Sequence, residues 1–177
     1  MRVNGKSYRT LWLTEDGISV QIIDQTQLPH RFAIETLRTV QDVAEAISEM
    51  RVRGAPLIGV SAAYGVALAM HTDPEDGHLH QVIKTLAATR PTAVYVTWAL
   101  TQMRAWLLPL AKEQRAAEAF RRAAQLAEDD VEICKAMGRW GLQIIQTQAE
   151  QKSREVHILP HCNAGWLAAI DYGTALA

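Results

Sequence analysis

The sequence predicts an α+β fold, in which short β-strands are followed by a helical bundle and then by the first strand–helix (βα) unit of an α/β domain. Three observations lead to this prediction. The first thirty residues hold short alternating or apolar runs, from Thr39 apolar residues recur at helical spacing, and a polar stretch at 148–155 precedes a new strand-like run. We therefore expect one domain over residues 1–150 and the start of a second over residues 151–177.

The N-terminal strands are indicated by a hairpin signal. Asp16-Gly17 lies between the apolar residues of Trp12-Leu13 and those of Ile18–Val20. An Asp-Gly pair between such runs favours a tight turn that joins two antiparallel strands. The run Gln27–His30 then ends the strand pattern, because its proline and polar residues do not alternate.

Six helices are expected after the strands. Thr39 is a suitable N-cap for the first, with Asp42 three residues later as a weak capping box. Pro56 suits the start of the second helix, because its ring fixes φ and it has no N–H to satisfy. A polar loop is expected at His71–His80. The predicted helices cover residues 40–50, 56–70, 79–88, 91–108, 111–127 and 129–147.

The last thirty residues differ in character. Gln148–Glu155 is polar and charged, and it is the best candidate for a linker. Val156–Leu159 is typical of a short buried strand, Pro160–Gly165 of a loop and Trp166–Ala177 of a helix. A single unit of this kind cannot bury both of its faces alone, so it predicts the opening of an α/β domain.

Composition excludes several classes of protein. The chain has 177 residues, of which 49% are hydrophobic and 21% charged, and its net charge is −1, as in ordinary soluble proteins. A net charge this close to zero does not provide the excess of basic side chains that is typical of nucleic-acid-binding proteins. The most apolar stretch, Ala55–Met70, is interrupted by proline, glycine and polar residues, so we expect no membrane span. Two cysteines form no disulfide framework or zinc motif, which favours the cytoplasm and argues against a metal.

The first candidate site is the run Arg53-Gly54-Ala55, directly before the apolar helix. The first N–H groups of a helix have no partner within it, and the positive end of the helix dipole lies there, so anions bind at this position. Gly54 lets the backbone come close to a ligand, and Arg53 can hold a phosphate with two N–H groups. The alternative is an ordinary helix start whose glycine makes a turn.

A similar arrangement recurs at Thr89–Thr92. Arg90 immediately precedes a helix that we expect to start at Pro91, and it can add a second positive charge to the same anion. The alternative is a capped helix with a solvated arginine. The repetition of an arginine beside a proline-started helix favours the shared use of both cations.

The third candidate site is the loop Pro160–Gly165, between the predicted strand and helix. Ligands in α/β sheets bind at the carboxyl ends of strands, and a helix dipole would lower the pKa of the Cys162 thiol. His161 and Asn163 flank it with a titratable ring and an amide. The alternative is a small buried cysteine in a turn. Cys134, on an apolar helix face, is expected in the core.

Five segments carry a resemblance to a known family, and they occur in the order IIDQTQLPH, VRGAPLIGVSAAYGVALA, TRPTAVYVTWAL, EDDVEICKAMGRWG and ILPHCNAGWLAAIDYGTAL. Together they resemble the methylthioribose-1-phosphate isomerases of the methionine salvage pathway. The same superfamily holds ribose-1,5-bisphosphate isomerases and the regulatory subunits of the translation-initiation exchange factor. The resemblance extends from about Tyr8 to Leu176, and the combination of RGAP with HCNAG is specific.

The resemblance implies an aldose–ketose isomerase, an intramolecular oxidoreductase that converts 5-methylthioribose 1-phosphate into 5-methylthioribulose 1-phosphate. It implies a cytoplasmic homodimer with no metal or organic cofactor, whose partner is a small sugar phosphate rather than nucleic acid or membrane. The substrate would lie between the N-terminal domain and a larger Rossmann-like domain. Arg53, Gly54, Ala55 and Arg90 match the substrate-binding residues, and Cys162 matches the active-site cysteine.

The family's aspartate acid/base, its glutamine and its Asn-Lys pair would lie beyond Ala177. We therefore expect this chain to hold the N-terminal half of the enzyme, with only the first βα unit of a truncated Rossmann-like domain, and to be inactive alone. Two alternatives stay open. One is a non-catalytic regulatory protein of the exchange-factor-subunit type, which works by protein contact, and the other is an isomerase of a related pentose 1-phosphate.

Overall fold

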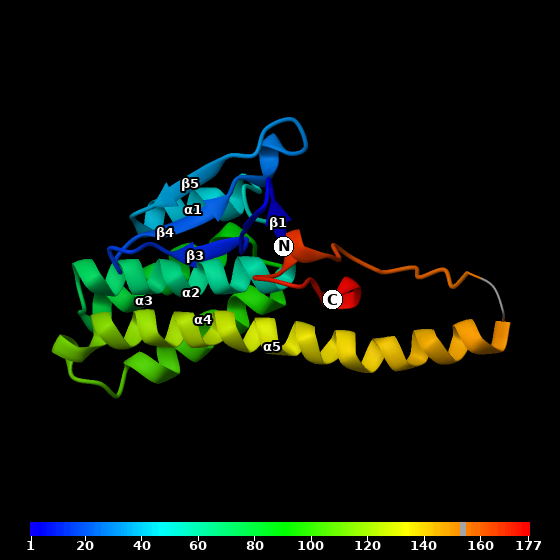
Figure 1. The fold of residues 1–177 in the computed structure, drawn as a ribbon. Helices are drawn as coiled ribbons and strands as arrows, with labels where there is room; N and C mark the ends of the chain where they lie inside the picture. The colour runs from blue at the N-terminus through cyan, green and yellow to red at the C-terminus, as the bar shows by residue number, and fades with distance from the viewer. Residues whose placement is uncertain (153–154) are drawn as a thin grey trace.

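A computed structural model of the protein describes residues 1–152 and 155–177 (Figure 1). Short strands and the first helix lie on one side of a long apolar helix, and the remaining helices pack around its other sides. The last helix extends well beyond the bundle, and the chain then returns along an extended path to the region of the N-terminus (Figure 1). The expected order of strands first and helices second is therefore confirmed.

The strands form two small antiparallel sheets. The first pairs β1 (Arg2–Val3) with β2 (Lys6–Ser7). The second has the order β3-β4-β5, with β3 at Leu11–Leu13, β4 at Val20–Ile23 and β5 at Ile34–Leu37. Strand β5 is not predicted from the sequence, because apolar and polar residues alternate only weakly along it. The strand is stabilised by its pairing with β4.

The hairpin predicted at Asp16-Gly17 is confirmed. Leu13 pairs with Val20, and the connecting turn is closed by the Asp16 carboxylate, which accepts hydrogen bonds from the backbone N–H groups of Ile18 at 2.9 Å and Ser19 at 3.0 Å. These bonds lower the pKa of Asp16 to about 2, with the bond from the Thr14 hydroxyl making the largest contribution. The turn is therefore longer than the two residues of the sequence signal.

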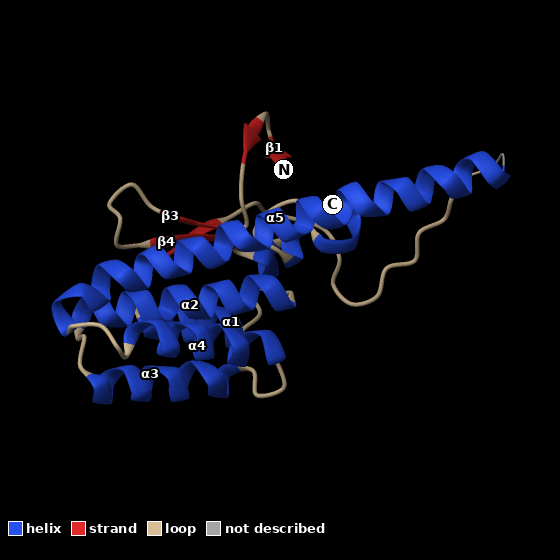
Figure 2. Ribbon diagram, turned by 90° about the horizontal axis from the view of Figure 1, so that it is seen from below, coloured by secondary structure: helices blue, strands red, loops and turns tan. Residues whose placement is uncertain are grey.

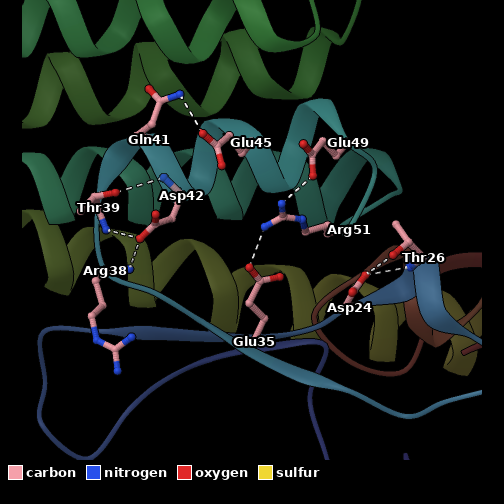
Figure 3. A network of polar contacts seen from close by, with 10 residues as sticks. All are labelled: Asp24, Thr26, Glu35, Arg38, Thr39, Gln41, Asp42, Glu45, Glu49 and Arg51. Carbon is pink, nitrogen blue, oxygen red and sulfur yellow. Dashed lines mark hydrogen bonds and ion pairs between the residues drawn. The ribbon is translucent and has the colours of Figure 1, made fainter.

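Helix α1 (Val40–Ser48) starts at the predicted capping box. The Thr39 hydroxyl accepts from the Asp42 N–H at 3.1 Å, and the Asp42 carboxylate accepts from the Thr39 N–H at 2.9 Å (Figure 3). Just after the helix, the Arg51 guanidinium donates to Glu35 of β5 at 2.6 Å and to Glu49 at 2.5 Å (Figure 3). Arg51 thereby fixes the loop that leads to the next helix.

Helix α2 (Ala55–Thr72) is the centre of the core. Every residue from 57 to 70 is buried. Helix α2 is contacted by α1, α3 (Asp76–Thr89), α4 (Val94–Leu107) and α5 (Lys112–Lys152) (Figure 2). By length and composition α2 could cross a membrane, but 78% of it is buried inside the protein. This degree of burial is what the core helix of a folded domain requires.

Two predicted helix boundaries are wrong. The polar loop expected at His71–His80 is helical except for residues 73–75, because the Asp76 carboxylate and the Pro74 carbonyl bind Arg115 and hold the turn between α2 and α3. Helix α4 begins at Val94 rather than Pro91, because Pro91 lies in a turn closed by a 2.9 Å bond from the Ala93 N–H to the Arg90 carbonyl.

The helices predicted at 111–127 and 129–147 are one continuous helix, α5 (Lys112–Lys152). Nothing at the expected break disrupts a helix, and the acidic side chains there have tertiary partners instead of capping roles: Glu128 pairs with Arg9, and Asp130 binds the Ile170 N–H. The linker predicted at 148–155 is therefore wrong for residues 148–152, while residues 153 and 154 lie outside the described residues.

The strand predicted at Val156–Leu159 and the helix predicted at Trp166–Ala177 do not form. The first segment is extended and mostly exposed, with Leu159 97% exposed, because no described strand lies beside it to complete a ladder. The second contains only the 3-10 helices η2 (Trp166–Ala168) and η3 (Thr174–Leu176). The βα unit is thus absent from the described residues, and the Rossmann-like domain from residue 151 stays a prediction.

Candidate functional site

The returning C-terminal segment closes a cavity against the start of α2. The cavity has a volume of about 350 Å³, and both Arg53 and Cys162 line it, although the two residues are far apart in the sequence. Its lining residues are Gln25, Arg53, Pro160, Cys162, Asn163, Ala164, Leu167 and Ala168. A larger hollow of about 680 Å³ lies among the strands and the turn at Asp16, but none of the predicted site residues lines it.

The Arg53 side of the cavity is the N-terminus of α2. Gly54 is the N-cap, no side chain caps it, and Pro56 lies in the first turn. The first N–H groups of the helix therefore have no side-chain acceptor, and they lie at the positive end of the helix dipole, next in the chain to the exposed residue Arg53. Ala55 is exposed in the first turn. This end of α2 has the local chemistry of an anion site.

Gly54 has a specific structural role at this point. Its φ is +96°, and a Cβ on it would lie 2.4 Å from both the Cα and the carbonyl oxygen of Ala168. The close approach predicted for Gly54 is therefore made by the protein's own backbone. Because of this contact, the segment that carries Cys162 can lie directly on the start of α2.

The Cys162 side of the cavity has an unusual backbone. Cys162 is exposed, and its φ of +68° lies in the left-handed region, which residues other than glycine, asparagine and aspartate rarely adopt. Such conformations concentrate at functional positions, where the surrounding structure holds them. The helix expected to follow the loop is replaced by the three residues of η2, so the predicted helix dipole is not present beside the thiol.

The segment after Cys162 is anchored by the rest of the domain. Thr10 donates its N–H to the Ile170 carbonyl at 3.1 Å and its hydroxyl to the Ala169 carbonyl, and the Asp130 carboxylate accepts from the Ile170 N–H at 2.8 Å. Asp130 is only 3% exposed, and this burial raises its pKa. Thr10, directly before β3, and Asp130 of α5 thus fix the chain at one end of the cavity.

The final turn is held against α5. Cys134 is fully buried, as predicted, and its Sγ accepts from the Thr174 N–H at 3.3 Å. Gly173 packs so closely on Gly165 that a Cβ would lie 2.1 Å from the Gly165 carbonyl carbon, and the Gly165 N–H donates back to the Gly173 carbonyl at 3.1 Å. The loop of residues 165–173 is therefore closed on itself.

The other predicted residues lie around the cavity rather than in its wall. Arg90 ends α3 and is half-buried in the turn before α4. Tyr95 in the first turn of α4 packs over Gly59 in the second turn of α2, where a Cβ would lie 2.3 Å from the ring. The Arg90 turn therefore belongs to the same end of the bundle as Arg53. The predicted residues that do not line the cavity are Gly54, Ala55, Arg90 and His161.

The cavity wall includes a polar residue that the sequence did not predict as part of the site, Gln25. It lies in the 3-10 helix η1 (Gln25–Gln27), which the Asp24 carboxylate caps by accepting from the Thr26 N–H at 3.0 Å. The signal available was its place in the run IIDQTQLPH, in which the strand pattern ends and polar residues follow. Nothing in that run indicated contact with residues 160–168.

The chain is similar to known proteins over most or all of its length. Residues 51–172 match the Initiation factor 2 subunit family. Over its full length the chain is 56% identical to methylthioribose-1-phosphate isomerase from Brucella anthropi and 56% identical to that from Rhizobium meliloti, and it covers 49% of each. The chain therefore spans about half the length of the curated relatives it matches.

Two solved structures share the fold. 5-methylthioribose 1-phosphate isomerase from Pyrococcus horikoshii OT3 has a TM-score of 0.80 and 34% identity, with 95% of this chain and 47% of that one covered. The translation initiation factor eIF-2B, subunit delta, from A. fulgidus has a TM-score of 0.78 and 35% identity, with 96% and 49% covered. Because one is named as an enzyme and the other as a translation factor, the fold alone does not decide between the two kinds of function.

Proposed function

The chain belongs to the Initiation factor 2 subunit family, and we propose that within this family it forms the N-terminal part of an aldose–ketose isomerase. The proposed reaction converts 5-methylthioribose 1-phosphate into 5-methylthioribulose 1-phosphate, a step of methionine salvage. The observation that carries the proposal is the joint presence of Arg53 and Cys162 on one cavity at the open N-terminus of α2. The identity to curated relatives that bear this enzyme's name supports it.

The two sides of the cavity suit the two parts of the proposed substrate, its phosphate and its sugar. The phosphate would bind the Arg53 guanidinium and the first N–H groups of α2, after Gly54 and Ala55, because a helix N-terminus and an arginine fork both favour phosphate oxygens. Arg90, at the same end of the bundle, would add a second positive charge. The sugar would then extend toward Cys162, in a cavity whose volume of about 350 Å³ is within the range of small-ligand sites.

The chemistry defines what the protein must supply. The phosphate on the anomeric oxygen blocks spontaneous ring opening, so an acid must protonate the ring oxygen. One hydrogen then moves from C2 to C1, either as a proton through an enediol-like intermediate or as a hydride. We assign Cys162 to this step, as the base that takes the C2 proton or as a group that stabilises the transition state. Deuterium from the solvent at C1 of the product would identify the proton route.

The proposed activity requires a further acid/base group in addition to the residues described above. The chain spans about half the length of its curated relatives, and the resemblance implies an aspartate in a second, Rossmann-like domain. Residues 1–177 alone are therefore expected to turn over little or no substrate, and substantial turnover by them would contradict this part of the proposal. A cytoplasmic homodimer that needs no metal or cofactor is part of the same proposal.

Substitution of Cys162 tests the assignment. In a protein that contains this chain and isomerises the substrate, Cys162→Ser is expected to lower kcat by about 100-fold or more, because a positioned proton-transfer group contributes about 10² to 10⁴ in rate. Cys134→Ala is the matched control, since it removes the other thiol, which lies in the core. Near-normal turnover of the Cys162→Ser protein would overturn the catalytic role.

A second candidate function is a regulatory protein that works by protein contact. The similarity to the eIF-2B delta structure, at a TM-score of 0.78, favours it. Titration with ribose 1-phosphate distinguishes the two. The isomerase proposal expects saturable binding that weakens when Arg53 is replaced by Ala and persists when the exposed Arg139 is replaced by Ala. A sugar phosphate that does not bind, together with capture of a translation factor, would favour the regulatory function.

A further inference from the structure

Gln25 connects the two sides of the proposed site. Its backbone N–H donates to the Arg51 carbonyl at 2.9 Å, two residues before Arg53. Its side-chain Nε2 donates to the Leu167 carbonyl at 2.7 Å, in the segment that follows Cys162. One half-buried residue thus contacts both the loop that presents the cation and the segment that presents the thiol.

Each of these two contacts is made to a fixed group. Arg51 is held by its bonds to Glu35 and Glu49, so its carbonyl has a defined position (Figure 3). On the other side, Leu167 belongs to η2, whose next residue, Ala168, packs on Gly54. Gln25 therefore bonds to two fixed groups, one through its backbone N–H and the other through its side chain. The length of the side chain sets the distance between these two groups.

We infer that Gln25 is a positioning residue, whose carboxamide holds the Cys162 segment in place over Arg53. This inference rests on the role of Cys162 in the proposed function. Among the described residues, no other side chain hydrogen-bonds to residues 160–168, and the loop has a backbone conformation at Cys162 that needs outside support. A shift of about 1 Å in a reacting group lowers turnover by about two orders of magnitude, so one hydrogen bond of this kind has a large effect on rate.

The side chain at position 25 must be a donor of glutamine's length. The partner is a carbonyl oxygen, which accepts only, and an amide N–H supplies the donor without a charge. Methionine has nearly the same length and shape but no N–H, so Gln25→Met removes the bond and little else. A glutamate would place a carboxylate against the Leu167 carbonyl at neutral pH and repel it.

The test combines a chemical and a kinetic readout. The first is the rate at which iodoacetamide alkylates Cys162 in the native protein, followed by mass spectrometry; the buried Cys134 reports any unfolding. The second is kcat and KM for 5-methylthioribose 1-phosphate. Gln25→Met is expected to change the alkylation rate several-fold and to lower kcat by about tenfold or more, with KM nearly unchanged because the phosphate contacts remain.

Gln27→Met is the matched control. Gln27 lies in the same 3-10 helix, its side chain is exposed, and among the described residues it has no hydrogen bond to residues 160–168, so this change replaces a glutamine of η1 without touching the Cys162 segment. It is expected to leave both readouts at the wild-type values. If Gln25→Met does not fold, Gln25→Glu takes its place, because it keeps the length and shape of the side chain, removes the donor and repels the Leu167 carbonyl at neutral pH, so it is expected to change both readouts at least as much.

The outcomes separate this inference from the proposed function. Unchanged alkylation and kcat in Gln25→Met, equal effects from Gln27→Met, or a raised KM with unchanged kcat would each overturn the positioning role. A wild-type protein that alkylates normally but isomerises nothing would refute the proposed function instead, and the alkylation comparison alone would then decide whether Gln25 sets the position of the Cys162 segment.

Discussion

Several residues around the cavity hold backbone conformations that side chains disfavour. Cys162, Tyr172 and Thr174 have φ values of +68°, +66° and +48°, and Gly54 has a φ of +96°. The three residues other than glycine cost of order 1–3 kcal/mol each and persist only where neighbouring contacts hold them. Bonds from Thr10, Asp130 and other residues of the domain supply this hold. The site is therefore maintained at the expense of local backbone energy.

Gly54→Ala is expected to destabilise the protein by more than about 2 kcal/mol. The new Cβ would meet the Ala168 backbone at 2.4 Å, and alanine disfavours a φ of +96°. Gly77→Ala is the control, because Gly77 has open space around its Cβ position in the first turn of α3, and a gain of up to about 1 kcal/mol is expected there. Chemical denaturation measures both. Equal effects would contradict the packing role of Gly54.

Cys162→Gly is expected to be more stable than Cys162→Ala by about 1 kcal/mol. Both changes remove the thiol, but only glycine adopts a φ of +68° without steric cost. Urea unfolding of the two variants, compared directly, measures the difference. A Cys162→Ala protein that is as stable as Cys162→Gly would mean that the left-handed conformation is not kept in solution.

At the scale of elements, some turns and helices follow from local sequence signals, and others depend on tertiary contacts. The capping box at Thr39, the turn at Asp16-Gly17 and the apolar run of α2 were predicted, because each is a property of neighbouring residues. The continuity of α5 was not, since Asp129 and Asp130 look like helix-start residues in the sequence. Their surroundings, with Asp130 buried against Ile170, decide the outcome.

Asp130→Asn is expected to be as stable as the wild type or more stable at neutral pH. Burial raises the pKa of Asp130 above its usual value of 3.8, so the stability that the protonated acid contributes is full below that value and is lost as pH rises through the folded-state pKa. Asparagine keeps an oxygen for the Ile170 N–H and does not ionise. Its advantage over the wild type should therefore grow as pH rises from about 4 to about 7.

Unfolding free energies across that pH range provide the measurement. Asp130→Leu is the contrasting variant, because it leaves the buried Ile170 N–H without its acceptor and is expected to lose about 1–3 kcal/mol at every pH. A difference between wild type and Asp130→Asn that stays constant with pH would show that Asp130 does not titrate with folding.

At the scale of the whole molecule, one buried arginine connects two of the turns between helices by hydrogen bonds. Arg115 of α5 is 3% exposed and donates to the carbonyls of Pro74, Leu108 and Leu110, as well as to Asp76. It therefore joins the turn before α3 to the turn before α5. These connections fix the helix ends near the C-terminus of α2, at the opposite end of that helix from the cavity at Arg53.

Arg115→Met is expected to lower the free energy of unfolding by about 3 kcal/mol, because three partly buried carbonyl groups lose their donor. Arg115→Lys should recover only part of the loss, since an ammonium group cannot reach all of these acceptors in the fixed geometry of a guanidinium. Thermal and urea unfolding provide the measurement. Arg121→Met, at an exposed ion pair with Glu118, is the control and should change little.

The sequence by itself determined the strands-then-helices order, the capped and apolar helices, and the residues Arg53 and Cys162 as candidates, because all of these follow from neighbouring side chains or from family resemblance. Only the tertiary structure decided that β5 pairs with β4, that α5 is one helix, and that residues 155–177 fold back without a strand. It also revealed Gln25 and the contact of Gly54 with Ala168. The physical reason is that a ladder, a buried carboxylate and a shared cavity wall each need a partner distant in the sequence, and the local pattern does not specify that partner.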